Sequence, residues 1–150
     1  MKLYLVRHAQ AEDGFPDFER RLTEAGRERT RLLARYLKPF LEDARMVSSP
    51  APRALETAQI LHERIGLKAG LVQDRVLYDG GLGAIATMVE SLKYPVAVVV
   101  GHEPTLSELG SLLSFGPNGR SPIELKKGGV IRIDDGRLRW VLDPKLLERV

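Results

Sequence analysis

The hydrophobic and polar positions along the chain form two patterns, short apolar runs and segments with apolar residues at helical spacing. These patterns alternate along the chain and predict strands separated by helices. Short apolar runs typical of buried strands occur at residues 3–6, 46–48, 71–76 and 96–100. The run at 96–100, Val-Ala-Val-Val-Val, is apolar at every position. A strand is apolar on both faces when helices cover both sides of a parallel sheet, so this run is predicted to lie centrally.

Four segments between or after these strands have apolar residues at helical spacing. In the first, Thr23 is a predicted N-cap. The apolar positions that follow it are Ala25, Leu32, Leu33, Tyr36, Leu37 and Phe40. The second segment has Pro52 in its first turn and Gly66 where it should end. Two further amphipathic helices are predicted around 85–92 and 106–113.

The C-terminal region departs from this pattern. Residues 130–134 and 138–142 are predicted strands that flank Asp135-Gly136, a sequence typical of a tight hairpin turn. The sequence Tyr-Asp-Gly-Gly at 78–81 predicts another turn. Strands that alternate with helices predict an α/β fold with a mainly parallel sheet, here edged by an antiparallel hairpin. The length of 150 residues predicts a single domain, residues 1–150.

Composition removes several classes of function. The net charge is only +3, and basic residues are interleaved with acidic ones along the chain, so nucleic-acid binding is not expected. Because the chain has no cysteine, it has no disulfide, no thiolate nucleophile and no cysteine zinc site. No apolar run approaches the roughly 20 residues that span a bilayer. We therefore expect no membrane association and a cytoplasmic protein.

Residues able to bind an anion follow three of the predicted strands. Arg7 and His8 follow the first strand, and His102 follows the strand at 96–100. Arg53 lies one turn into the helix that follows the second strand. Ligands of open α/β sheets bind at the carboxyl ends of the strands. If these strands are neighbours, two histidines and two arginines converge on one pocket.

Such a pocket suits phosphoryl transfer. The planar guanidinium groups of Arg7 and Arg53 can each donate to two oxygens of a phosphoryl group and remain charged. The free ring nitrogen of a neutral His8 can attack phosphorus, provided that an acceptor such as a backbone carbonyl holds its other nitrogen. The nearby positive charges should keep His8 neutral. His102 would act as a proton donor or a cationic clamp.

Four segments, in this order, resemble the motifs of the histidine phosphatase (phosphoglycerate mutase-like) superfamily. They are Leu-Val-Arg-His-Ala at 5–9, Leu-Thr-Glu-Ala-Gly at 22–26, Ser-Ser-Pro-Ala-Pro-Arg-Ala-Leu-Glu-Thr-Ala at 48–58 and Val-Gly-His-Glu-Pro at 100–104. The resemblance runs from Met1 to about Leu113. It implies a three-layer fold, a phosphate acceptor at His8, a phosphate pocket made by Arg7, Arg53 and His102, and no metal or other cofactor.

The short chain and its Arg-His-Ala opening look most like the small SixA-type phosphohistidine phosphatases. The segment between Arg53 and His102 has no room for the cap insertions of larger relatives. This resemblance implies a metal-independent phosphatase that forms a covalent phosphohistidine on His8 and acts on phosphohistidine of a partner protein. The oligomeric state stays open.

Two alternative functions are retained. One is a phosphatase of the same chemistry whose substrates are small phosphorylated metabolites, that is, phosphate esters. The other is a non-catalytic module that binds phosphate or a phosphoprotein, although such a module need not keep both histidines. A metal site is disfavoured, because the arginines would repel a cation.

No residue is a clear general acid. Asp79, Glu103 and Glu12 are the candidates, although Asp79 fits a turn residue better than an acid and Glu103 is no clearer as an acid. An imidazole leaving group needs less protonation than an alkoxide does. The lack of a clear acid therefore favours phosphohistidine over phosphate esters as the substrate.

Overall fold

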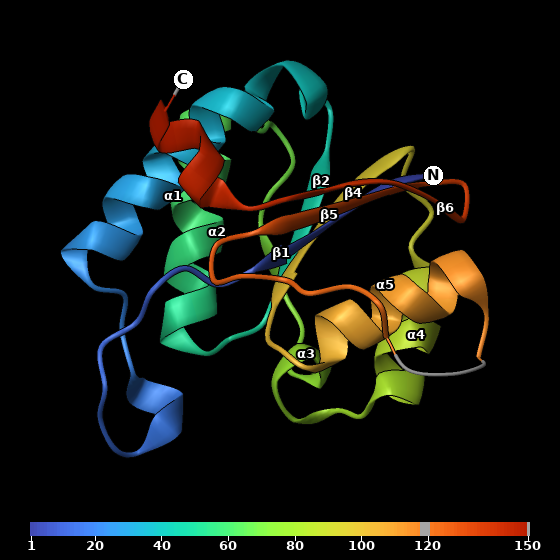
Figure 1. Cartoon of the computed structure of the whole chain (residues 1–150), viewed down its shortest axis with the longest axis horizontal. Helices are drawn as coiled ribbons and strands as arrows, with labels where there is room; N and C mark the ends of the chain where they lie inside the picture. Colours follow the sequence, from blue (N-terminus) through green and yellow to red (C-terminus); the bar gives the residue numbers. More distant parts are fainter. Residues whose placement is uncertain (118–120, 150) are drawn as a thin grey trace.

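One six-stranded sheet organises the chain in this computed structural model, which describes residues 1–117 and 121–149 (Figure 1). The strands are β1 (Lys2–Arg7), β2 (Arg45–Ser48), β3 (Val72–Gln73), β4 (Val96–Gly101), β5 (Val130–Asp134) and β6 (Arg137–Leu142). Their order is β3-β2-β4-β1-β5-β6. The first four strands of this order pair in parallel, and β5 and β6 extend the sheet as an antiparallel hairpin. The predicted α/β sheet with its C-terminal hairpin is confirmed.

Helices cover both faces of the sheet and complete a three-layer architecture. The α-helices are α1 (Glu24–Leu37), α2 (Pro52–Ile65), α3 (Val76–Asp79), α4 (Leu82–Ser91) and α5 (Thr105–Phe115). The 3-10 turns are η1 (Asp17–Glu19), η2 (Lys38–Phe40) and η3 (Pro144–Arg149). Helices α1 and α2 lie on one face, and α3, α4 and α5 lie on the other (Figure 1). None of the helices in the described ranges is long and apolar enough to span a membrane.

The apolar core lies on both sides of the two central strands. In β1, Tyr4 and Val6 pack toward α1 and α2, whereas Leu3 and Leu5 pack toward α4 and α5. All four side chains are buried. The same alternation divides β4 between the two cores. Burial on both faces explains why these strands are apolar at every position rather than at every second one.

The buried face of α1 differs from the predicted one. Its N-cap is Thr23, as expected, and the Thr23 hydroxyl accepts a hydrogen bond from Gly26 N at 3.0 Å. The residues that α1 buries are Gly26, Thr30, Leu33, Ala34 and Leu37, and the predicted core positions Ala25, Tyr36 and Phe40 are exposed. Near the start of α1 the small residues Gly26 and Thr30 are buried in place of Ala25. At its end, Tyr36 and Phe40 pack against each other on the exposed side, with ring centroids 6.0 Å apart.

The region after α2 also differs from the prediction. The predicted strand at 71–76 is reduced to Val72–Gln73. The Asp74 carboxylate accepts a hydrogen bond from Val76 N, and one turn of helix, α3, begins there. The predicted turn at 78–81 therefore starts inside a helix. A polar side chain that binds the backbone two residues ahead is a local alternative to continuing the strand.

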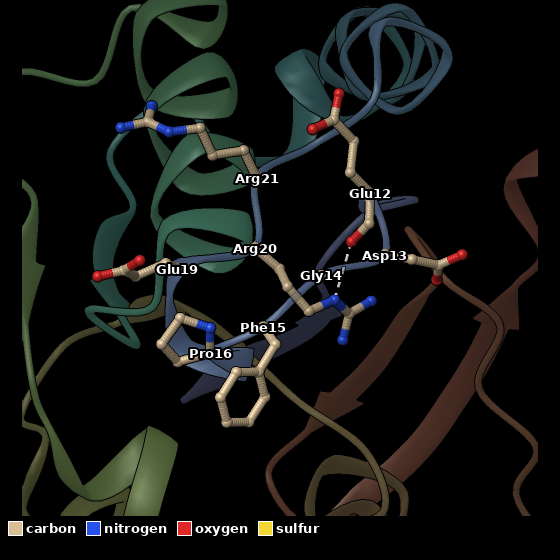
Figure 2. A pocket seen from close by; sticks show the side chains of 8 residues that line it. All are labelled: Glu12, Asp13, Gly14, Phe15, Pro16, Glu19, Arg20 and Arg21. Carbon is tan, nitrogen blue, oxygen red and sulfur yellow. Dashed lines mark hydrogen bonds between the residues drawn. The ribbon is translucent and has the colours of Figure 1, made fainter.

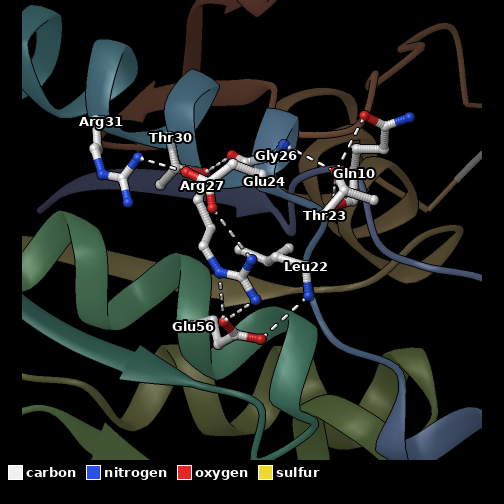
Figure 3. A network of polar contacts seen from close by, with 9 residues as sticks. All are labelled: Gln10, Leu22, Thr23, Glu24, Gly26, Arg27, Thr30, Arg31 and Glu56. Atoms are coloured by element: carbon white, nitrogen blue, oxygen red, sulfur yellow. Dashed lines mark hydrogen bonds and ion pairs between the residues drawn. The ribbon is translucent and has the colours of Figure 1, made fainter.

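A polar network joins α1, α2 and the segment before α1 (Figure 3). The Glu56 carboxylate of α2 accepts hydrogen bonds from Leu22 N and from Arg27 Nε, both at 3.1 Å. Gly26 lies directly against Gln10, and a Cβ atom at residue 26 would lie 2.3 Å from the Gln10 carbonyl oxygen. Only glycine allows α1 to approach the chain this closely. The network fixes where the polypeptide leaves the sheet after β1.

Replacing Gly26 with alanine should destabilise the protein although alanine is the better helix former. The new methyl group must displace backbone, and overpacking of this kind costs about 2 kcal/mol. Gly83→Ala in α4 is the matched control, because its Cβ would meet nothing within 4 Å, and it should stabilise the protein by about 0.5 kcal/mol. Urea denaturation measures both effects. A Gly26→Ala midpoint equal to that of the wild type would contradict the argument.

Candidate active site

The strand register brings the four predicted site residues to one edge of the sheet. Arg7 pairs with Gly101, and Ser48 pairs with Val100, so β1, β4 and β2 end side by side. The rings of His8 and His102, which follow β1 and β4, lie 5.3 Å apart between centroids. The sequence predicts one pocket if these strands are neighbours, and β2, β4 and β1 are neighbours in the sheet.

The backbone holds His8 on both sides. Its N–H donates to the Gly101 carbonyl at 3.0 Å, and its carbonyl accepts from Gly128 N at 2.9 Å. Gly128 has φ +74°, which favours glycine at that position. The ring atom Nδ1 lies 2.7 Å from the Ala9 carbonyl. A carbonyl can only accept, so Nδ1 carries the proton and Nε2 keeps a free lone pair.

His8 is uncharged at neutral pH. Its side chain is buried, and this burial lowers the pKa of His8 to about 4. The bond to Ala9 opposes the shift, and the charges of Arg53 and Arg7 add to it. A neutral imidazole with a free nitrogen is the form required of a nucleophile.

His102 is held as an uncharged donor. Its Nε2 lies 2.8 Å from the Ser49 hydroxyl oxygen, which accepts from Ala51 N at 3.2 Å. When the Ser49 hydroxyl donates to Nε2, the ring proton of His102 is on Nδ1. Burial first, and then the Arg53 charge, lower the pKa of His102 to about 3. An uncharged ring fits neither the predicted proton donor nor the predicted cationic clamp, but in this tautomer its Nδ1–H is a hydrogen-bond donor.

The arginines present further donors to the same place. Arg7 donates through one terminal nitrogen to the Leu125 carbonyl at 2.8 Å. The terminal nitrogens of Arg53 donate to the carbonyl and the carboxylate of Asp17, at 2.9 and 3.0 Å. Three buried nitrogens have no hydrogen-bond partner within the described residues: Arg7 Nε, Arg53 Nε and His102 Nδ1. Buried donors normally find acceptors, and the oxygens of a bound oxyanion would supply them.

Four polar side chains of the site were not identified from the sequence: Asp17, Ser49, Thr57 and Tyr78. The Thr57 hydroxyl accepts from Ala9 N at 3.1 Å and donates to the Arg53 carbonyl at 2.8 Å, so it joins the two halves of the pocket. Ser49 and Thr57 lie inside the motif at 48–58, and the i, i+4 spacing of Thr57 from Arg53 is a signal that could have found it. Asp17 and Tyr78 carry no such signal, because each lies in an irregular part of the chain.

Aromatic groups form one wall of the site. The Tyr78 ring of α3 contacts the His102 ring edge to face at 5.6 Å between centroids, and the Phe18 ring contacts Tyr78 in the same way at 5.0 Å. The Tyr78 hydroxyl donates to the Asp17 carboxylate at 3.2 Å. The wall therefore joins α3 to η1 at the solvent-exposed edge of the site, where Asp17 lies, and this edge is called the mouth below.

Of the three candidate general acids, Asp79 and Glu103 have other partners and Glu12 is exposed. Asp79 forms an exposed ion pair with Arg75 at 2.8 Å. Glu103 accepts from Ser107 N at 2.7 Å in the first turn of α5. The Glu12 side chain is exposed. In residues 1–117 and 121–149, no hydrogen bond joins any of these carboxyls to His8 or His102.

A neutral histidine with a free ring nitrogen thus lies beside buried arginine and histidine nitrogens that have no partner within the described residues, an arrangement suited to an oxyanion. The family model of the histidine phosphatase superfamily (branch 1) matches residues 3–91. The chain belongs to this superfamily, and it is a phosphatase. An uncharacterized protein of Picosynechococcus sp. is 35% identical over 147 residues, which cover 93% of this chain and 88% of that protein.

Solved structures agree with this assignment. The structure of the protein histidine phosphatase SixA complexed with tungstate is 25% identical, with a TM-score of 0.86 over 98% of this chain and 99% of that one. A putative phosphohistidine phosphatase SixA from Agrobacterium tumefaciens has a TM-score of 0.82 at 24% identity, over 95% of this chain and 97% of that one. The predicted resemblance to SixA-type enzymes and their fold is confirmed.

Acidification should destabilise the protein through His8. Unfolded histidine has a pKa near 6.5, so between about pH 6.5 and the folded pKa of about 4 the unfolded state binds a proton that the native state does not. The stabilisation is complete above about pH 6.5 and is lost as the pH falls. From about pH 7 to pH 5 the free energy of unfolding should drop by about 2 kcal/mol for His8 alone. Urea denaturation at both pH values should show a smaller drop for His8→Asn, and an equal drop would contradict this assignment.

Proposed function

We propose that this chain is a metal-independent phosphatase that forms a covalent phosphohistidine on His8 and dephosphorylates phosphohistidine on a partner protein. The observation that carries the proposal is the free Nε2 of a neutral His8 beside three unpaired donors. The similar SixA structure is described as a complex with tungstate, a tetrahedral oxyanion. A phosphoryl group has the same tetrahedral set of oxygens.

The reaction has two displacements. In the first, the Nε2 lone pair of His8 forms a bond to phosphorus, and the bond to the leaving group breaks with its electron pair on that group. The proton stays on Nδ1, which donates a hydrogen bond to the Ala9 carbonyl, so the phosphorylated ring is cationic. In the second, water attacks phosphorus, the P–Nε2 bond breaks, and its pair returns to His8. Both water hydrogens leave with the phosphate as dihydrogen phosphate, and His8 is again neutral.

The donors act on the phosphoryl oxygens in both steps. Arg7 Nε, Arg53 Nε and His102 Nδ1 would donate to non-bridging oxygens, where charge must be stabilised in the transition state. Leu125 and Asp17 hold the outer nitrogens of the two guanidinium groups, so the donors are oriented before substrate arrives. Preorganised donors of this kind stabilise a transition state without reorganisation during the reaction.

A protein-borne substrate is supported by the short segment between Arg53 and His102. It contains the rest of α2, the two residues of β3, one turn of α3, the ten residues of α4, and β4. A phosphorylated side chain projecting from a folded partner needs an approach that no large insertion covers. This segment is consistent with such an approach.

The central test follows the covalent intermediate. Wild-type protein, with a chelator present, should hydrolyse p-nitrophenyl phosphate and a phosphohistidine protein, and acid-labile, alkali-stable phosphate should be trapped on His8. His8→Ala should lose turnover by roughly a thousandfold or more, whereas the control His62→Ala, on the far half of α2, should keep it. Wild-type turnover in His8→Ala would exclude the covalent mechanism. Absence of hydrolysis of both substrates by the wild type would favour the binding module.

Arg53→Ala should reduce kcat/KM by about a hundredfold, near 3 kcal/mol of transition-state stabilisation, because one oriented donor is lost. Arg64→Ala, an exposed arginine on the same helix, is the matched control for charge and helix propensity and should stay near wild type. Steady-state kinetics on p-nitrophenyl phosphate measures both. An equal loss in the two variants would show that the effect is one of net charge.

A further inference from the structure

Asp17 lies in a loop that has no part in the four sequence motifs. The loop comprises residues 12–21, with η1 at its tip, and is named the Asp17 loop here. It is closed at its base by an antiparallel bridge between Ala11 and Leu22 and by the bond from Glu12 N to the Arg21 carbonyl at 2.8 Å. The Arg20 side chain crosses the loop to the Glu12 carbonyl (Figure 2). These contacts give the loop a defined structure, which places Asp17 at the site.

The Asp17 carboxylate meets three donors at the mouth of the pocket. Its Oδ1 accepts from Arg20 at 3.0 Å, and its Oδ2 accepts from Arg53 at 3.0 Å and from Tyr78 at 3.2 Å. The bond from Arg20, followed by the charge and bond of Arg53, lowers the pKa of Asp17, so the group is ionised at neutral pH. A carboxylate has about four acceptor positions. With 55% of its side chain exposed, Asp17 can accept a further hydrogen bond from the solvent side.

The leaving group must come out on this side. In a displacement at phosphorus, the attacking and leaving atoms lie roughly in line on opposite sides of the phosphoryl group. His8, the attacking group, is 7% exposed and lies at the bottom of the site. Arg53, which would hold the phosphoryl oxygens, is bonded on its outer side to Asp17. A leaving group opposite His8 therefore departs at the mouth, where the Asp17 carboxylate and the Tyr78 ring lie.

A phosphohistidine leaving group differs from an ester there. Its ring has a second, remote nitrogen, which binds a proton near neutral pH and makes the ring cationic. When the P–N bond breaks, its electron pair returns to the ring, which departs as neutral imidazole with the proton still on the remote nitrogen. No acid has to protonate the departing atom. The alkyl or aryl group that leaves from a phosphate ester has no such remote N–H group.

We propose that Asp17 is a specificity-determining residue that accepts a hydrogen bond from the remote N–H of a phosphohistidine substrate and stabilises its cationic ring. This inference rests on the proposed function and assigns the part of the site that recognises the leaving group. Asp17 favours the cationic phosphoramidate by charge and disfavours dianionic phosphate esters by repulsion. The same carboxylate keeps the Arg53 fork aligned for any substrate.

The test is a comparison of two substrates in two variants. Asp17→Asn keeps the size of the side chain and removes its charge, and Asp13→Asn is the matched control, an exposed aspartate of the same loop. The kcat/KM ratio for free phosphohistidine over p-nitrophenyl phosphate should fall about tenfold in Asp17→Asn, the loss expected for one charge-assisted hydrogen bond. It should stay at the wild-type value in Asp13→Asn. The difference should shrink from about pH 6.5 to pH 9, as the remote nitrogen of the substrate loses its proton.

The outcomes separate the two proposals. A ratio that Asp17→Asn leaves unchanged at every pH would overturn the inference. Equal losses on the two substrates would make Asp17 a positioning residue for Arg53, and no loss on either would give it no role. In both cases the wild type still hydrolyses phosphohistidine, so the proposed function stands. A wild type that hydrolyses only p-nitrophenyl phosphate overturns the phosphohistidine function itself and, with it, this role of Asp17.

Discussion

The pairing of β4 between β1 and β2 is the constraint on which the site depends. Because Arg7 pairs with Gly101 and Ser48 pairs with Val100, the C-terminal ends of β1, β4 and β2 are aligned at one edge of the sheet. A slip of one residue would turn every side chain of a strand to the other face. The register is secured because Tyr4 and Val6 belong to one core and Leu3 and Leu5 to the other. The catalytic geometry is thus fixed by apolar packing beneath it.

That packing supports an arrangement that is unfavourable by itself. Two arginines and two histidines are gathered where both imidazoles are held uncharged by burial and by the neighbouring guanidinium groups. Buried donors without acceptors cost stability, and a bound phosphoryl group would satisfy them. Asp17 partly compensates the positive charge from the rim, where it is ionised and half exposed. The site is therefore suited to an anion, and its positive charge is partly balanced at its exposed edge.

Much of this could be predicted from the sequence, and the reasons for the misses are local. The strands at 3–6 and 96–100 and the positions of Arg7, His8, Arg53 and His102 follow from motif and periodicity, because strand ends in a parallel sheet share one edge. The edge strand β3 and the one-turn helix α3 depend on a side-chain bond of Asp74, which periodicity does not report. Asp17 and Tyr78 meet only through tertiary structure, across 61 residues of chain.

The residues at the strand ends and those at the mouth of the site contribute differently to specificity. In the proposed function, the residues at the strand ends act on the phosphoryl group, which is the same in every substrate of the class, and the sheet fixes them. The residues at the mouth, Asp17 and Tyr78, come from a loop and a one-turn helix. Loops tolerate substitution far better than the elements they connect. Because the Asp17 loop is closed at its own base by Ala11 and Leu22, its tip can change without disturbing β1. The leaving group can therefore be selected by residues whose replacement leaves His8 in place, although a change at Asp17 also removes a partner of Arg53.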